Sequence, residues 1–172
     1  ITYNGSFLYP RGGAIEYVNA VLRHITDPQI RKNCNVKSID TNRKVVILDT
    51  GEEIAYDRII STMPFPILLN KSIIAYDKDI YSWNQVLVFN LGFNKKGPEV
   101  NNHWIYSPNK DYSFYRVGFY DNILSQDRTS LYVELGFNKD AIINPYDYLY
   151  KVLNDLREAG FISSYMELVD YE

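Results

Sequence analysis

Two arginines that lie far apart in the sequence are each surrounded by aromatic residues. Arg11 follows the segment Phe7–Pro10 and precedes a pair of glycines, and Arg116 directly follows Phe114 and Tyr115. The planar guanidinium group matches phosphate oxygens geometrically and stays charged at any working pH. Neighbouring rings can stack on the planar or sugar parts of the same ligand. The pattern therefore predicts a clamp for an anionic ligand.

A second aromatic segment precedes Arg116 and contains Trp104, Tyr106 and Pro108. One interpretation is that Trp104 and Tyr106 line the ligand pocket together with Tyr115. The alternative is that they form one alternating face of a β-hairpin, with Arg116 as a surface ion-pair partner. The sequence leaves both interpretations open.

The composition is that of a globular protein with one domain over residues 1–172. Hydrophobic residues make up 46% and charged residues 23% of the chain, and the net charge is −3. This balance argues against binding to nucleic acid, which requires many cations. Cys34 is the one cysteine, and no apolar run is long enough to span a membrane. We therefore expect a cytoplasmic protein, and the spacing of His24, His103 and Cys34 predicts no metal site.

The order of the predicted elements is typical of an α+β fold with a mixed, mainly antiparallel sheet and a few flanking helices. Both ends look cut, so we expect a piece of a longer protein. The first half is predicted to contain a helix over 14–25, a meander over 36–56, a buried strand from Arg58 that stops at Pro64, and a short helix or turn through Leu69. The second half is predicted to contain strands over 84–93, 102–106, 113–120 and 130–137, and a helix from Asn144 to about Ala159.

Residues 35–64 resemble the superfamily of flavin-dependent amine oxidases and protoporphyrinogen oxidases. The residues that match its pattern are Val36, Ile39, Tyr56, Asp57, Ile59, Ile60, Thr62 and Pro64. The resemblance implies a fragment of a two-domain FAD/NAD(P)-binding flavoprotein in which 36–64 contributes to the FAD-binding region. It also implies that the Val36 backbone reads the adenine, that Ser61, Thr62 and Met63 lie by the dinucleotide, and that Gly12 and Gly13 approach the flavin. A plain three-stranded meander is the alternative.

Within this superfamily, the arginine and aromatic segments look like those of UDP-galactopyranose mutases of the eukaryotic type and related bacterial proteins of lipopolysaccharide (LPS) biosynthesis. The resemblance implies that Arg11 and Arg116 grip the diphosphate of a nucleotide sugar, beside Trp104, Tyr106 and Tyr115. The chemistry would then take place at flavin N5, without a catalytic side chain. Glu16 departs from the family pattern, because it places a negative charge near the flavin or the substrate.

The chain contains no G-x-G-x-x-G fingerprint for the FAD pyrophosphate. We therefore expect the 172 residues alone to be inactive, to retain little or no FAD and to self-associate through their exposed cofactor-facing surface. Two other functions stay open: a flavin oxidoreductase acting on an amine or a CH–CH bond, and a non-enzymatic carbohydrate- or protein-binding module.

Overall fold

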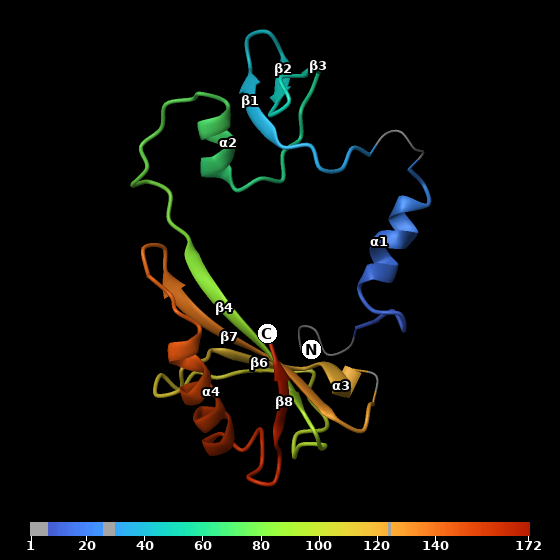
Figure 1. The fold of residues 1–172 in the computed structure, drawn as a ribbon, viewed down its shortest axis with the longest axis vertical. Helices are drawn as coiled ribbons and strands as arrows, with labels where there is room; N and C mark the ends of the chain where they lie inside the picture. Colours follow the sequence, from blue (N-terminus) through green and yellow to red (C-terminus); the bar gives the residue numbers. More distant parts are fainter. Residues whose placement is uncertain (1–6, 26–29, 124) are drawn as a thin grey trace, which may run out of the picture. The chain divides into compact units, whose positions relative to one another are not determined.

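The computed structural model describes residues 7–25, 30–123 and 125–172. These residues form helices and strands that gather into two compact units, and each unit is described by itself (Figure 1). Unit 1 comprises Ile1–Arg11 and Trp83–Glu172, and unit 2 comprises Gly12–Ser82. A single domain over residues 1–172 stays a prediction.

Unit 2 contains the predicted meander. The chain can turn between the first two strands of the meander because the Asp40 carboxylate accepts hydrogen bonds from the backbone N–H groups of Asn42 and Arg43 at 3.1 and 2.9 Å. The first helix is shorter than predicted and has no buried residue. The elements are α1 (Ile15–Leu22), β1 (Val36–Asp40), β2 (Val45–Leu48), β3 (Glu53–Ala55) and α2 (Phe65–Lys71), with the strands antiparallel in the order β1-β2-β3.

The predicted buried strand from Arg58 to Pro64 is not formed, and this prediction is wrong. Ile59 is 44% exposed and Ile60 is 94% exposed. A strand needs a neighbour to pair its backbone N–H and C=O groups, and no described strand pairs with this segment. The apolar side chains of Ile59 and Ile60 are therefore left exposed in unit 2.

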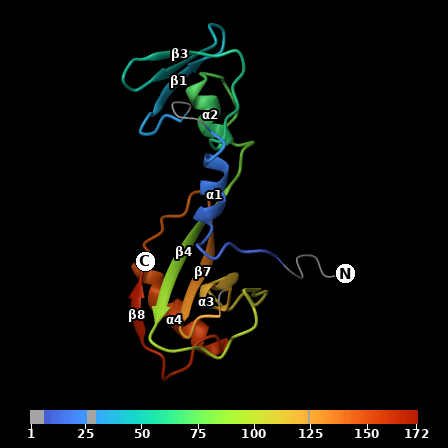
Figure 2. The same ribbon diagram turned by 90° about the vertical axis from the view of Figure 1, so that its right-hand side faces the viewer.

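Unit 1 is built on a five-stranded antiparallel sheet in the order β5-β6-β7-β4-β8, of which Figure 2 labels β7, β4 and β8. The two long central strands pair over their full length, from Asn84 with Asn138 to Phe93 with Thr129. The elements are β4 (Asn84–Phe93), β5 (Trp104–Tyr106), β6 (Arg116–Phe119), α3 (Tyr120–Ile123), β7 (Thr129–Asn138), α4 (Tyr146–Glu158) and β8 (Leu168–Tyr171). The predicted antiparallel α+β fold is confirmed.

The core of unit 1 lies between the sheet and α4. Successive side chains of a strand point to opposite faces, so the apolar alternate residues gather on one face. Val117 of β6 and Val133 of β7 are fully buried there, and they share the core with Val152 and Leu156 of α4. In each strand, the residues that alternate with the buried ones therefore lie on the opposite face of the sheet, away from α4.

A buried carboxylate of α4 anchors the loop that leads into β6. Asp155 is 6% exposed and accepts the Ser113 backbone N–H at 2.7 Å. Lys151, one turn earlier, donates to both Asp155 oxygens at 3.0 Å and to the Asp111 carbonyl at 3.2 Å. Burial raises the pKa of Asp155, but the hydrogen bonds from Ser113 and Lys151 outweigh it and hold that pKa below its ordinary value.

We expect Asp155→Asn to lower the free energy of unfolding by about 2 kcal/mol at neutral pH, since it removes a charge-assisted hydrogen bond to the loop. Because the folded pKa of Asp155 is depressed, its contribution is present above about pH 4. It is lost as the pH falls through the folded value. Urea unfolding at pH 7 and below pH 3 measures both effects. Glu158→Gln, on the exposed end of α4, is the control and should change neither; an equal loss at both pH values would contradict the assignment.

Candidate functional site

The face of the unit 1 sheet opposite α4 carries aromatic and charged residues in two cross-strand rows. We call it the aromatic face. Directly opposite residues in neighbouring strands have their Cβ atoms about 5 Å apart, so each row is a line of contacts. One row consists of Tyr106, Arg116, Glu134 and Val88, and the next consists of Trp104, Gly118, Tyr132 and Asn90.

Arg116 is the cation at the centre of the aromatic face. Its guanidinium carbon lies 5.6 Å from the ring centres of both Tyr106 and Tyr132. Arg116 Nη1 also donates to the Tyr106 hydroxyl at 3.1 Å, and Nη2 donates to Glu134 Oε1. The buried Nε has no hydrogen-bond partner among the described residues. The side chain is 32% exposed, so the cation is held in place but is still open to solvent.

Tyr115 precedes β6 and reaches the aromatic face above Gly136, where an added Cβ would lie 3.6 Å from its ring. Its hydroxyl donates to Glu134 Oε2 at 2.5 Å. This hydrogen bond, together with burial and the negative charge of Glu134, raises the pKa of Tyr115. The phenol therefore stays protonated and remains a hydrogen-bond donor at neutral pH.

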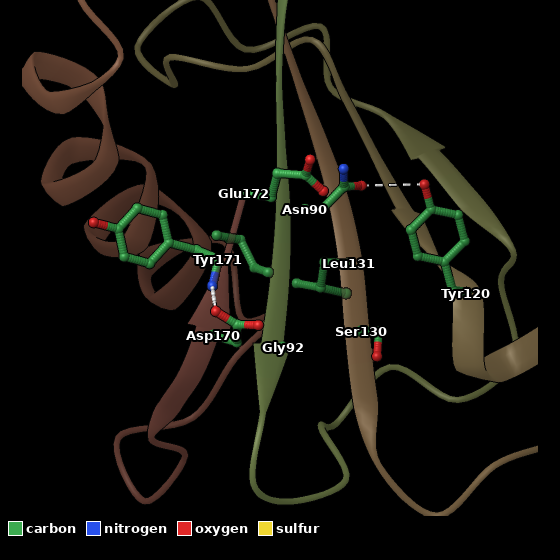
Figure 3. A pocket seen from close by; sticks show the side chains of 9 residues that line it. Asn90, Gly92, Tyr120, Ser130, Leu131, Asp170, Tyr171 and Glu172 are labelled. Atoms are coloured by element: carbon green, nitrogen blue, oxygen red, sulfur yellow. Dashed lines mark hydrogen bonds between the residues drawn. The ribbon is translucent and has the colours of Figure 1, made fainter.

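The second row continues as a pair of mutually tilted tyrosine rings toward β4 and α3. The rings of Tyr120 and Tyr132 lie 5.0 Å apart, and burial raises the pKa of both hydroxyls. Tyr120 donates to Asn90 Oδ1 at 3.2 Å at the rim of a pocket of about 230 Å³ (Figure 3). Ser130 and Asp170 also line this pocket, so its wall carries several polar groups.

The segment before Arg11 packs against the edge of the aromatic face. The Phe7 ring lies 5.5 Å from that of Trp104 and 4.8 Å from that of His103. Burial is the main cause of the raised pKa of Tyr120, and the nearby Tyr9 raises that pKa further. Arg11 itself is exposed, and no hydrogen bond or ion pair joins it to another described residue. Its part in a diphosphate clamp stays a prediction.

The residues predicted to hold the cofactor all lie in unit 2 and are exposed or half-buried. Gly13 has a φ of +90°, which favours glycine, and an added Cβ would meet no atom within 4 Å. The Val36 carbonyl already accepts Lys71 Nζ at 2.5 Å. Because a carbonyl has two lone pairs, Val36 can still accept from an adenine. These features of Gly13 and Val36 are compatible with a flavin cofactor, and the roles of Gly12, Gly13, Val36, Ser61, Thr62 and Met63 stay predictions.

The structure brings Trp104, Tyr106, Tyr115 and Arg116 together on one face of unit 1, and their roles in substrate binding stay predictions. Sequence reasoning missed Glu134 and Tyr132. The signal was available, since a glutamate in the middle of an otherwise apolar strand is unfavourable unless it has a partner. Among the described residues no cluster of ligands could hold a metal ion.

The chain belongs to the family described as flavin containing amine oxidoreductase, whose model matches residues 2–164. In structure it is similar to reduced UDP-galactopyranose mutase, with a TM-score of 0.81 and 20% sequence identity over 95% of this chain and 39% of that chain. A protein of Pyrococcus furiosus is also similar, with a TM-score of 0.56 and 14% identity over 81% of this chain and 36% of that chain. The chain thus spans well under half the length of either structure. At these identities the likeness shows the fold.

No curated protein matches the chain with significance. None of the described helices has the length and apolar character needed to cross a lipid bilayer.

Proposed function

We propose that the chain is the substrate-side central portion of an FAD-dependent, UDP-galactopyranose mutase-like enzyme, acting in cytoplasmic synthesis of cell-surface polysaccharide such as LPS. The observation that carries the proposal is Arg116, whose guanidinium carbon lies 5.6 Å from the centres of two tyrosine rings on the aromatic face and whose side chain is still 32% exposed. The likeness to UDP-galactopyranose mutase supports it.

The residues of the aromatic face suit the two parts of a nucleotide sugar. Arg116 would bind a diphosphate oxygen, because charge-assisted hydrogen bonds from a planar fork are strong and directional. Tyr106 is 59% exposed and presents a ring and a hydroxyl to the uridine or sugar part. Since the whole chain carries a net charge of −3, attraction of the anion depends on this local cation.

The cofactor-binding residues of unit 2 would hold FAD, which when bound supplies the nucleophilic nitrogen for chemistry at the sugar. Gly13 would let the cofactor approach the backbone closely, and Val36 would orient the adenine. The part of this chain is to bind and orient, and the chemistry belongs to the cofactor.

A flavin oxidoreductase that oxidises an amine or a CH–CH bond is the second candidate. The family description itself favours it, because that description names an amine oxidoreductase. This function needs the fold and the flavin but no cation for a diphosphate. Binding of a nucleotide sugar separates the two candidates.

The full-length protein is expected to be yellow, with a flavin absorbance band at about 450 nm. After reduction of the flavin, it is expected to interconvert the pyranose and furanose forms of UDP-galactose. Residues 1–172 produced alone should retain little FAD and should self-associate through exposed apolar side chains such as Ile60 and Ile73. Absorbance spectra and light scattering measure these properties.

A colourless full-length protein would remove both flavin functions and leave a non-enzymatic binding module. A yellow protein that oxidises amines and does not bind UDP would favour the second candidate. A stoichiometric flavin complex of the 172 residues would contradict the expectation that these residues alone retain little FAD.

A further inference from the structure

Glu134 is a buried carboxylate in the middle of the sheet. It is 7% exposed and lies between Val133 and Leu135, which are fully buried on the opposite face. An ionised carboxylate loses several kcal/mol of hydration on burial unless partners replace the water. The residue is therefore stable there because of its partners on the aromatic face.

Both carboxylate oxygens of Glu134 accept hydrogen bonds, each from a different residue that is predicted to bind the ligand. Arg116 Nη2 donates to Oε1, and the Tyr115 hydroxyl donates to Oε2 at 2.5 Å. Arg116 and Tyr115 are adjacent in sequence, so without a common acceptor their side chains would be free to adopt separate rotamers. One carboxylate thus fixes two neighbouring donors in a single arrangement.

The remaining contacts of Arg116 leave it little freedom once Glu134 holds it. The centres of the Tyr106 and Tyr132 rings both lie 5.6 Å from its guanidinium carbon, and the Tyr106 hydroxyl accepts a hydrogen bond from Nη1. A long cationic side chain that is already ordered loses less conformational entropy when it binds a ligand. The network is pre-organised around the cation.

We propose that Glu134 is a positioning residue for anion recognition: it holds Arg116 and Tyr115 in the geometry that receives the diphosphate and does not itself touch the ligand. The inference rests on the function proposed above. The expected change in ligand affinity on removing Glu134 has a direction that distinguishes positioning from simple charge repulsion. Removing a negative charge next to an anion site would strengthen binding if charge alone decided, whereas loss of positioning weakens it.

The test is calorimetric titration of the full-length protein with UDP, and separately with uridine, which lacks the phosphates. Glu134→Ala is expected to raise the Kd for UDP about 10-fold and to leave uridine binding unchanged. Glu134→Gln keeps an acceptor for Arg116 and should recover most of the affinity, with a Kd within about 3-fold of wild type but still higher. Glu158→Ala, an exposed glutamate of the same unit, is the control.

Tighter or unchanged UDP binding in both Glu134 variants would overturn the positioning role. Equal losses for UDP and uridine would also overturn it, because they would indicate a general structural defect. Thermal unfolding monitors the fold, and if Glu134→Ala does not fold, the same criteria apply to Glu134→Gln. A wild-type protein that binds no UDP would refute the proposed function itself, so the two failures are distinguishable.

Discussion

Replacing Arg116 by alanine should weaken UDP binding to the full-length protein by about 100-fold or more. Arg116 is the cation at the centre of the aromatic face, and truncation of a charged, hydrogen-bonded partner typically costs 2–5 kcal/mol, or roughly 30- to 5,000-fold in Kd. Arg116→Lys keeps the charge but loses the planar fork, so we expect an intermediate loss of about 10-fold. Titration calorimetry with UDP measures both.

The control for this prediction is Arg157→Ala, which removes an exposed arginine of α4 on the other side of the sheet. It should bind UDP as the wild type does. Because Arg116→Ala also leaves the Glu134 carboxylate buried without its ion-pair partner, thermal unfolding must accompany the titration. A folded Arg116→Ala protein with wild-type affinity for UDP would contradict the mutase-like function.

Adding one methyl group at Gly118 should destabilise unit 1 by about 3 kcal/mol, at the upper end of the usual cost of overpacking. A Cβ at Gly118 would lie 1.8 Å from Cε1 of Tyr132, because the Tyr132 ring lies directly across β6 at this position. The ring would have to leave its place between Arg116 and Tyr120. Urea unfolding of Gly118→Ala measures the loss, and UDP affinity should fall with it.

Gly136→Ala is the matched control, since it adds the same methyl group to a strand of the same sheet. Its Cβ would meet the nearest atom, in the Tyr115 ring, at an ordinary 3.6 Å. An alanine also restricts the unfolded chain more than a glycine does, so the change should be neutral or stabilising by up to about 1 kcal/mol. Equal destabilisation by both substitutions would mean that the contact with Tyr132 does not decide the effect.

Sequence patterns predicted the elements of unit 1 well because local pattern and tertiary environment agree there. The run over 84–93 is apolar at the positions that face α4, and it forms β4 over those residues. The helix that begins near Pro145 also forms. It does so without a side-chain N-cap, because the Asn144 side chain donates a hydrogen bond to the Asp147 carboxylate at 3.1 Å and not to the helix backbone. In such segments burial reinforces what propensity already favours.

The failures have a different cause, namely partners that local sequence does not reveal. The segment from Arg58 to Pro64 reads as a strand from its composition, but a strand exists only with a neighbour to pair with. The opposite holds for Glu134, which looks misplaced in an apolar run until Arg116 and Tyr115 appear across β6. Both arginines were identified from sequence, yet which groups hold Arg116 could be learned only from the register of β5, β6 and β7.

The register between β4 and β7 has a consequence for how the protein is made. β4 pairs with β7 along its whole length, and at its other edge it pairs with β8 near the end of the chain. During synthesis β4 therefore emerges from the ribosome well before either of the strands that flank it. Such non-local pairing closes slowly and leaves an unpaired edge exposed in the meantime. The nascent chain is most vulnerable to aggregation in the interval before residues 129–138 have emerged from the ribosome.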